Sequence, residues 1–256
     1  MIDIDNVFLR YDNLDGTHTN AVNGVSVRVK DGERLAVVGA SGCGKSSLLY
    51  LTAGLAVPNS GAVLYNGRPM TSPHADIALI LQDYGLFPWK TVYKNAALSL
   101  KLRGADKAEI KKKVTPLLEE MGLADKLNAY PESLSGGQRQ RVAIARALVT
   151  EPKVLLMDEP FAALDVITQE SMEDIVLNMC EKSKLTLIMV THNIEEAVFI
   201  GQRIAIFGPE PGKLANVEEN PHCGEPDYRR SPMFFRLCNS VRAQLRESKN
   251  GGGTLA

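Results

Sequence analysis

The sequence predicts an α/β fold built around a mostly parallel sheet, and two observations predict it. Three apolar runs, residues 153–157, 185–190 and 203–207, have the length and composition of buried strands. Helical patterns at residues 169–182 and 194–200 lie between these runs. Strands that alternate with helices along a chain form a mostly parallel sheet with helices on both faces. We therefore expect one large α/β domain.

Further strands are predicted in the first third of the chain. Valines alternate with polar residues over residues 25–29, a turn follows at residues 31–33, and an apolar run occupies residues 34–38. This order predicts a half-buried strand, a tight turn and a buried strand. Two more short strands are predicted at residues 62–65 and 77–81, each next to a turn or a polar end.

A helical segment interrupts this pattern. Amphipathic helical patterns at residues 91–103, 107–121 and 136–149 follow one another without a strand between them. We interpret the segment from about residue 91 to about residue 150 as a helical insertion. A chain of 256 residues has room for one large α/β domain with such an insertion. We place that domain at residues 1–215.

The chain loses its alternation of strands and helices from about Pro209 onward. This region contains several prolines and ends with three consecutive glycines at residues 251–253. Glycine-rich ends are flexible because glycine restricts the backbone least. We expect residues 216–256 to form a C-terminal appendage with a flexible end.

Composition and charge exclude several classes of protein. Hydrophobic residues make up 45% and charged residues 23% of the chain, which is typical of a globular protein. A formal net charge of −1 provides no long-range field that would attract nucleic acid, so we expect no nucleic-acid partner. The cysteines are far apart and predict reduced thiols in a reducing cytosol. They are Cys43, Cys180, Cys223 and Cys238. A metal site at His222, Cys223 and Cys238 is the less favoured alternative.

The N-terminal segment and the hydropathy pattern bear on location. Residues 1–11 carry acidic residues and lack the basic start and apolar run of a signal peptide. No run approaches the roughly 18 uninterrupted apolar residues that span a bilayer. The best run, residues 142–149, is short and is broken by Arg146. We expect neither export nor a membrane span, so any association with a membrane is peripheral and goes through a partner.

A glycine-rich loop lies between the predicted strand at residues 34–38 and a helical pattern at residues 46–55. It fits the P-loop pattern G-x-x-x-x-G-K-[ST] in the strand-to-helix context that this pattern requires. The loop consists of Gly39, Ala40, Ser41, Gly42, Cys43, Gly44, Lys45 and Ser46, and Ser47 follows it. Its glycines let backbone N–H groups converge on phosphate oxygens at a helix N-terminus. We expect Lys45 to reach the β and γ phosphates and the Ser46 hydroxyl to bind Mg²⁺.

Two acids follow a buried apolar strand. Asp158 ends the run at residues 153–157 and therefore lies at the carboxyl edge of the sheet, where ligands of open α/β folds bind. We expect Asp158 to hold Mg²⁺ through water. Glu159 can reach the water that attacks the γ-phosphate and act as a general base or a positioning group. An ordinary acidic pair at a strand end is the alternative, and it is weak beside a P-loop.

A second glycine motif narrows the class of NTPase. Leu134 is followed by Ser135, Gly136, Gly137 and Gln138, and this motif opens a helical pattern twenty residues before Asp158. A serine and two glycines at a helix N-terminus form a second phosphate cradle. With its LSGGQ motif unaltered, the chain resembles the ABC ATPase family over about residues 1–215. The resemblance implies an ATPase that binds two ATP molecules between two copies of itself.

The same resemblance implies a fold and further site residues. The fold is a P-loop NTPase core of the RecA-like type, with an N-terminal antiparallel β subdomain and a helical subdomain. Tyr11 matches the aromatic residue that stacks on adenine. Gln82 matches the Q-loop residue that senses the γ-phosphate and Mg²⁺. Asp165 matches the D-loop residue that crosses to the partner. His192 matches the switch histidine that contacts the γ-phosphate. The implied cofactors are ATP and Mg²⁺, with Ser46, Gln82 and Asp158 at the metal and Glu159, His192 and Lys45 in catalysis. A packing role for Tyr11 and a structural role for His192 are the alternatives.

The departures from the family pattern are mild. Ser47 stands where threonine is commoner, Ala162 replaces a usual serine before the D-loop, and Asn193 replaces the usual aspartate after His192. Each of the three changes leaves the groups needed for hydrolysis in place. We therefore expect an active enzyme.

One segment indicates a branch of the family. The pair Pro88-Trp89 before Thr91-Val92 resembles the nitrate, sulfonate and taurine importers. In that branch the segment from Gln82 to Val92 borders the groove that receives the membrane-spanning permease. The resemblance implies an ATPase subunit at the cytoplasmic face of the inner membrane, working with a permease and, indirectly, a solute-binding protein. A packing role for Trp89 remains the alternative reading of this residue.

Other functions within and outside the family are less favoured. An importer for another solute and an exporter remain alternatives. DNA-repair and chromosome ATPases need a long coiled-coil insertion for which this chain has no room, and translation-associated members normally carry two P-loops. A metabolic P-loop kinase would lack LSGGQ. A binding module without catalysis would be expected to lack Lys45, Glu159 or His192, and all three are present.

Overall fold

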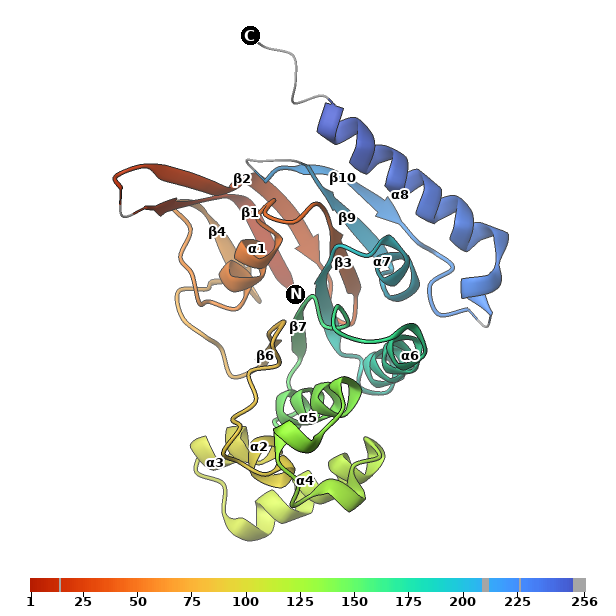
Figure 1. Cartoon of the computed structure of the whole chain (residues 1–256). Coiled ribbons are helices and arrows are strands. Elements are labelled where there is room, and N and C mark those ends of the chain that lie inside the picture. The colour runs from red at the N-terminus through yellow and green to blue at the C-terminus, as the bar shows by residue number, and fades with distance from the viewer. Residues whose placement is uncertain (14, 209–211, 226, 251–256) are drawn as a thin grey trace. The chain divides into compact units, whose positions relative to one another are not determined.

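The structure is a computed structural model, and it describes residues 1–13, 15–208, 212–225 and 227–250 (Figure 1). The chain divides into two compact units. The first unit comprises Met1–His74 and Leu177–Ala256, and the second comprises Ala75–Val176.

The first unit contains an antiparallel sheet with strand order β2-β1-β4-β5. Its strands are β1 (Ile2–Asp12), β2 (His18–Val29), β4 (Ser60–Tyr65) and β5 (Arg68–Pro69). Buried and exposed residues alternate along the second half of β2, as the valine pattern predicts. This sheet confirms the expected N-terminal antiparallel β subdomain.

The first unit also contains a largely parallel sheet segment with strand order β10-β9-β3-β8. Its strands are β3 (Arg34–Val38), β8 (Thr186–Thr191), β9 (Arg203–Phe207) and β10 (Leu214–Glu219). Every residue of β3 and β8 is buried, because helices cover strands of parallel sheets on both faces. Helices α1 (Lys45–Thr52) and α7 (Ile194–Ile200) follow β3 and β8 and pack on them.

The C-terminal region adds regular structure to the first unit. The expected boundary after residue 215 falls inside β10, which pairs antiparallel with β9. A short 3₁₀ turn, η3 (Tyr228–Arg230), leads into a long helix, α8 (Pro232–Asn250), which packs against α7 (Figure 1). Phe234 and Val241 of α8 are buried. The expected appendage is therefore an edge strand and a covering helix. The three glycines at residues 251–253 lie outside the described residues.

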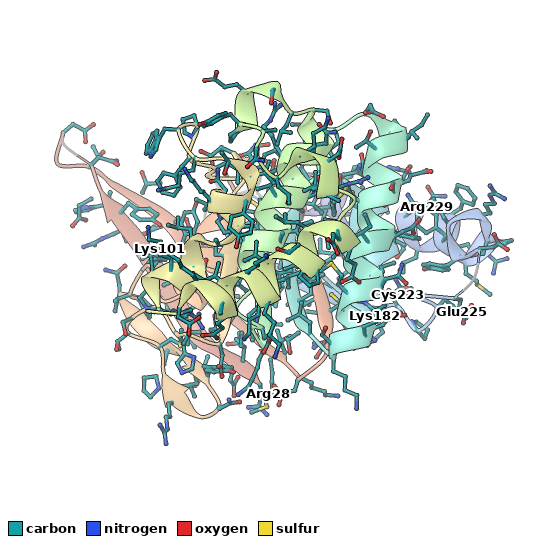
Figure 2. All side chains as sticks on the ribbon, turned by 90° about the horizontal axis from the view of Figure 1, so that it is seen from below. Arg28, Lys101, Lys182, Cys223, Glu225 and Arg229 are labelled. Carbon is teal, nitrogen blue, oxygen red and sulfur yellow. The ribbon has the colours of Figure 1, made fainter. Side chains whose placement is uncertain are left out.

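A cation–π contact also fastens this C-terminal region to α7. The Arg229 guanidinium lies 3.8 Å from the centroid of the Phe199 ring. Arg229 is labelled in Figure 2. Such a contact contributes about 0.5–1 kcal/mol at an exposed site and more where water is excluded.

The second unit combines two parallel strands with a set of helices. Strands β6 (Ile77–Ile80) and β7 (Val154–Asp158) pair parallel, with Ile80 opposite Met157. The helices are α2 (Val92–Ala96), α3 (Leu98–Leu102), α4 (Lys107–Glu120), η1 (Ala124–Lys126), η2 (Pro131–Ser133) and α5 (Gly136–Leu148), and α6 (Val166–Ser183) begins in this unit. The helix predicted at residues 91–103 is in fact two short helices that meet at Ala97.

Two findings concern the membrane and the thiols. Over the part of the chain that the structure describes, no helix is both long enough and apolar enough to cross a membrane. All four cysteines are free thiols, and three of them, Cys43, Cys180 and Cys238, are buried.

Candidate functional site

The P-loop, residues 39–46, follows β3 and leads into α1 in the first unit. Gly42 and Gly44 have φ of 81° and 92°, in the left-handed region that favours glycine. A Cβ at Gly44 would lie 1.8 Å from the carbonyl oxygen of Ala21, and a Cβ at Gly39 would lie 2.8 Å from the Cys43 sulfur. The loop therefore has this path only because glycines occupy these positions.

Lys45 is held inside the P-loop. Its side chain is 4% exposed, and its Nζ donates to the carbonyl oxygens of Gly39 and Ala40 at 3.0 and 2.9 Å. Gly44, the N-cap of α1, has no side chain to cap the helix, and the N-terminus of a helix attracts an anion. A fixed ammonium, converging N–H groups and the positive end of a helix fit the phosphates of a nucleotide.

Two residues from other parts of the chain, Tyr11 and Gly212, lie at the P-loop. The Tyr11 hydroxyl donates to Ser47 Oγ at 3.4 Å, and the Tyr11 side chain is 42% exposed, so the ring is available for stacking. Gly212 packs behind the loop, since a Cβ there would lie 2.1 Å from the Cys43 carbonyl oxygen. Sequence reasoning missed Gly212 because it lies in the region without a strand–helix pattern.

The switch segment follows β8 in the first unit. His192 is exposed between two anchored residues. The Thr191 hydroxyl donates to the carboxylate of the buried Glu196 at 2.5 Å, and Asn193 caps α7 by accepting from the N–H groups of Glu195 and Glu196. Asparagine thus performs the N-cap role that the usual aspartate would perform at this position. The anchors on both sides fix the backbone that carries His192.

The acidic edge lies in the second unit at the carboxyl ends of β6 and β7. Because Ile80 pairs with Met157, Gln82 and Glu159 both lie two residues beyond paired positions. Gln82 Nε2 donates to Glu159 Oε2 at 3.5 Å. Glu159 has φ of 45°, a strained value for a residue with a side chain, and such strain concentrates at functional sites. Asp158 is 4% exposed at the end of β7.

The signature segment, residues 134–138, begins α5 in the second unit. Ser135 is the N-cap: its Oγ accepts from the Gln138 N–H, while Gln138 Oε1 accepts from the Ser135 N–H, which completes a capping box. A Cβ at Gly137 would lie 2.5 Å from Thr168 Cγ2, and one at Gly136 would lie 3.3 Å from a Leu164 methyl. A Cβ at Gly137 would overlap Thr168, so this glycine is needed for close packing, whereas a Cβ at Gly136 would only be a tight contact.

The D-loop contacts the signature segment through one residue that sequence reasoning missed. Asp165 accepts from the Thr168 hydroxyl at 2.7 Å and from the Thr168 N–H at 3.0 Å. These two bonds lower the pKa of Asp165 below its ordinary value of 3.8. The methyl group of the same threonine packs against Gly137. The spacing from Asp165 to a threonine three residues later was the available signal, because it is the pattern of an N-cap.

The segment from Gln82 to Val92 exposes aromatic surface in the second unit. The Trp89 side chain is 70% exposed and packs edge-to-face on Phe87 with ring centroids 5.3 Å apart. Asn95, which is completely buried, accepts from the Phe87 N–H and donates to the carbonyl oxygens of Phe87 and Lys90. Trp89 is therefore presented to solvent by a loop with a fixed backbone.

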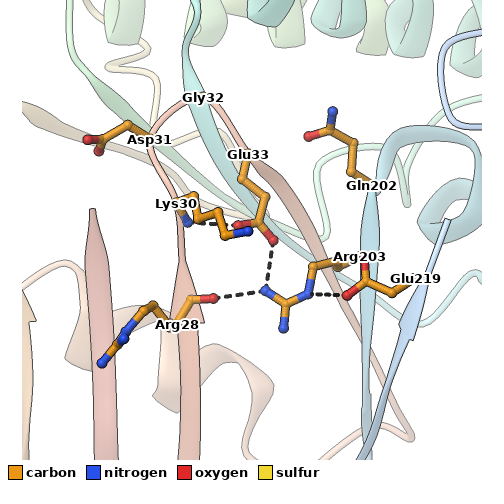
Figure 3. Close-up of a pocket in the computed structure, with 8 residues that line it drawn as sticks. All are labelled: Arg28, Lys30, Asp31, Gly32, Glu33, Gln202, Arg203 and Glu219. Carbon is orange, nitrogen blue, oxygen red and sulfur yellow. Dashed lines mark hydrogen bonds and ion pairs between the residues drawn. The ribbon is translucent and has the colours of Figure 1, made fainter. Parts of the chain in front are cut away.

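A separate hollow of about 590 Å³ lies in the first unit at the amino ends of β3 and β9. Figure 3 shows that Arg203 contacts three other residues that line the hollow. It donates to the Glu33 carboxylate at 2.8 Å and to the Arg28 carbonyl oxygen at 2.9 Å, and it forms an ion pair with Glu219. Glu33 also accepts from the Lys30 N–H. These contacts connect β2 and the turn before β3 with β9 and β10 around the hollow.

The structure thus groups the predicted residues within each unit. In the first unit Tyr11 lies at the P-loop, and the switch segment is a separate anchored turn. In the second unit Gln82 lies beside Glu159, and Asp165 is linked to the signature segment through Thr168. A P-loop between a strand and a helix, together with a second glycine cradle at a helix N-terminus, defines the class of P-loop NTPases with an ABC signature.

Comparison with known proteins agrees with this class. The family model described as "ABC transporter" matches residues 22–162. The nitrate import ATP-binding protein NrtD of Synechocystis is 41% identical over 88% of each chain. The aliphatic sulfonates import ATP-binding protein SsuB of Bacillus subtilis is 40% identical over 92% of this chain and 91% of its own length. The taurine import ATP-binding protein TauB of Roseobacter denitrificans is 40% identical over 83% of this chain.

Solved structures show the same fold. The dimeric ATP-binding cassette MJ0796, in a post-hydrolysis state bound to ADP and Pi, superimposes with a TM-score of 0.76 at 31% identity, covering 86% of this chain and 98% of that one. The cassette cbiO1 of Clostridium perfringens, part of an ABC transporter complex, gives a TM-score of 0.75 at 27% identity and covers 96% of this chain. The chain belongs to the ABC transporter family and is an ATP-binding ATPase of that class.

Proposed function

We propose that this chain is the ATP-hydrolysing subunit of an ABC importer for nitrate, a sulfonate, taurine or a related small anionic or organic solute. The observation that carries the proposal is the presence of two different phosphate cradles in one chain. One is the P-loop around Lys45, and the other is the capped glycine turn at Ser135. Two copies, each offering both cradles, form two equivalent ATP sites.

The P-loop binds the nucleotide in this proposal. Its N–H groups and Lys45 hold the β and γ phosphates, and Tyr11 stacks on adenine from β1. Ser135, Gly136 and Gly137 of the second copy contact the γ-phosphate at the start of α5. Asp165 of each copy belongs to the same interface. Both copies therefore contribute residues to each ATP.

Glu159 is the general base or water-positioning group. It takes a proton from, or orients, the water that attacks the γ-phosphate, while the Gln82 amide holds its carboxylate. His192 contacts the γ-phosphate from its anchored turn. Ser46, Gln82 and Asp158 would hold Mg²⁺, because their side chains carry oxygen atoms of the kind that this ion prefers, and the ion would neutralise charge at the phosphates.

The segment from Gln82 to Val92 is the contact with the permease. Exposed Trp89 on a rigid loop is the kind of aromatic anchor that dominates protein interfaces. The permease places the chain peripherally at the cytoplasmic face of the membrane and connects it indirectly to a solute-binding protein. Solute selection belongs to those partners. An importer for another solute, or an exporter, is the second candidate, because both use the same ATPase chemistry.

Purification of the tagged chain from membranes tests the proposal. We expect it to bring down a membrane-spanning permease, and the accompanying solute-binding protein to bind nitrate, taurine or an alkanesulfonate in a calorimetric screen. A binding protein specific for an unrelated solute would change the substrate assignment only. A permease that uses ATP to accumulate its cargo inside inverted vesicles would be an exporter and would contradict import.

A further inference from the structure

The segment from Gln82 to Val92 is fastened at its first half by one arginine of α5. Arg146 Nη1 donates to the carbonyl oxygen of Gly85 at 2.6 Å, and Nη2 donates to the carbonyl oxygen of Tyr84 at 2.5 Å. A guanidinium presents its donors in a planar fork, so a single side chain can satisfy two neighbouring carbonyls at once. Lysine, with one compact ammonium on a flexible stem, cannot reproduce this geometry.

The turn held by Arg146 has an unusual backbone. Tyr84 and Gly85 have φ of 63° and 56°, and the Gly85 N–H donates to the Asp83 carboxylate at 3.1 Å. A left-handed conformation costs about 1–2 kcal/mol for a residue with a side chain such as Tyr84. The two bonds from Arg146 help to offset that cost. The position of this turn therefore depends on α5.

The second half of the same segment is fastened differently. Asn95 of α2 holds the backbone of Phe87 and Lys90 through hydrogen bonds that involve no residue of α5, although α2 itself packs against α5. The loop is thus held internally through Asn95 and hydrogen-bonded directly to α5 through Arg146. These two functions can be separated by mutation.

Arg146 lies in the last turn of α5, and the signature segment forms the start of the same helix. The helix has 13 residues and is therefore about 20 Å long. Val142, Ala143 and Ile144 are completely buried, so packing holds the helix as a rigid rod. When ATP bridges two copies and displaces the N-terminus of α5, the rigid helix transmits this displacement to Arg146.

We propose that Arg146 is a positioning residue that couples the signature segment to the permease-facing loop, so that ATP-driven docking of the second copy moves the Tyr84–Gly85 turn. This inference rests on the proposed function for the identity of the two surfaces. The coupling itself is a property of the second unit, since every residue in the chain of contacts lies there. It requires no contact between Arg146 and either ATP or the permease.

The chain contains its own reporter for this coupling. Trp89 is the only tryptophan, it is 70% exposed, and it lies on the loop in question. The test uses the full chain with Glu159→Gln as the parent, so that bound ATP persists. Acrylamide quenching of Trp89 is measured with Mg·ATP and with Mg·ADP, and dimer formation is followed by size-exclusion chromatography.

We expect ATP to change Trp89 quenching in the parent, and Arg146→Lys to lose most of that change while it still forms the ATP-dependent dimer. The matched control is Arg141→Lys. Arg141 is another arginine of α5 that donates to a backbone carbonyl, but it bonds Met121 rather than the loop. The control is expected to keep the full response. An unchanged Trp89 response in Arg146→Lys would overturn the inference.

If Arg146→Lys does not fold, a second variant tests the same contact by changing the loop instead of the arginine. Gly85→Ala leaves the guanidinium in place, because its Cβ would make an ordinary contact 3.5 Å from Arg146 Nη2. The φ of 56° at this position is unfavourable for alanine, so the variant strains the turn without removing a buried charge. It is expected to weaken the Trp89 response as well, and a full response would contradict the proposal. A parent that dimerises with ATP but shows no Trp89 response overturns this inference alone. A parent that forms no dimer overturns the proposed function.

The same variant is then assayed with the permease. In the complex purified from membranes, Arg146→Lys is expected to lower the permease-stimulated ATPase about 2- to 30-fold relative to the basal ATPase of the isolated chain, the range found when coupling residues are removed. A purely structural role would lower both activities in parallel.

Discussion

The Gln82 amide donates to the Glu159 carboxylate at 3.5 Å across the carboxyl ends of two paired parallel strands. The register of β6 and β7 creates this contact, because Ile80 pairs with Met157 and both chains then continue for two residues. Two residues that the sequence identifies separately, one as a γ-phosphate sensor and one as a base, are thus neighbours. A change in the position of Gln82 therefore changes the environment of Glu159.

Gln82→Ala is expected to lower kcat for ATP hydrolysis about tenfold. This factor corresponds to the lower end of the free energy that is lost with a hydrogen bond to a charged group. ATP binding should be nearly unchanged, because Lys45 and the P-loop supply most of the phosphate contacts. Steady-state ATPase assays and calorimetric ATP titration separate the two effects. Equal losses in kcat and affinity would show that Gln82 acts mainly in binding.

Gly137→Ala is expected to impair the signature segment by steric overlap. The new Cβ would lie 2.5 Å from Thr168 Cγ2, and overpacking of this kind costs about 1–3 kcal/mol. Thr168→Ser removes the methyl group and keeps the hydroxyl that bonds Asp165. We therefore expect the double variant to regain stability in urea unfolding and part of the ATPase activity. Failure of Thr168→Ser to rescue Gly137→Ala would refute the packing explanation.

Trp89→Ala is expected to leave thermal stability and basal ATPase unchanged, because its side chain is 70% exposed. Transport by the complex with the permease should fall, since an aromatic anchor of an interface contributes about 2 kcal/mol or more. Leu102→Ala, at a residue of α3 that is 78% exposed, is the matched control and should keep transport. Parallel loss of basal ATPase in Trp89→Ala would favour simple packing.

Buried thiols predict the response to alkaline pH. Burial raises the pKa of Cys180 to about 12 from an ordinary value of 9.0, and that of Cys238 to about 11. The folded state therefore favours the neutral thiols. Below pH 9 the thiols are neutral in the unfolded chain as well, and their contribution to the free energy of unfolding is complete. It is lost as the pH rises from about 9 toward 12, because only the unfolded chain ionises there. Urea unfolding at pH 8 to 11 should show falling stability, with a shallower fall in Cys180→Ala. If the free energy of unfolding fell equally steeply with pH in the unchanged chain and in Cys180→Ala, the expectation would be wrong.

The sequence predicted most of the fold because its strands and helices have strong local patterns. The runs that became β7, β8 and β9 are short, apolar and separated by helices, and their bounds agree with the prediction to within one residue. The C-terminal region was harder. β10 is an edge strand, and three of its six residues are polar or charged, so it has no continuous apolar run to detect.

The candidate site was predicted from motifs, and its supporting contacts were not. Glycine and lysine spacing identifies the P-loop because phosphate binding requires those residue types. The role of Thr168 depends on a methyl group that meets Gly137 thirty-one positions earlier in the chain, and the role of Arg146 depends on two carbonyl oxygens. Neither residue belongs to a motif whose chemistry demands it. The N-cap spacing from Asp165 points to Thr168, but only the three-dimensional packing reveals the contact of its methyl group with Gly137 and the two bonds of Arg146.

The central claim is that this chain hydrolyses ATP as a pair with Glu159 as the catalytic carboxylate. Glu159→Gln keeps the size of the side chain and the partner of the Gln82 amide but removes the base, so hydrolysis should fall about 10²- to 10⁴-fold. The direct measurement is light scattering of Glu159→Gln with Mg·ATP and with Mg·ADP. The account predicts a stable dimer with ATP and a monomer with ADP. Near-normal hydrolysis by Glu159→Gln, or a monomer with both nucleotides, would contradict it.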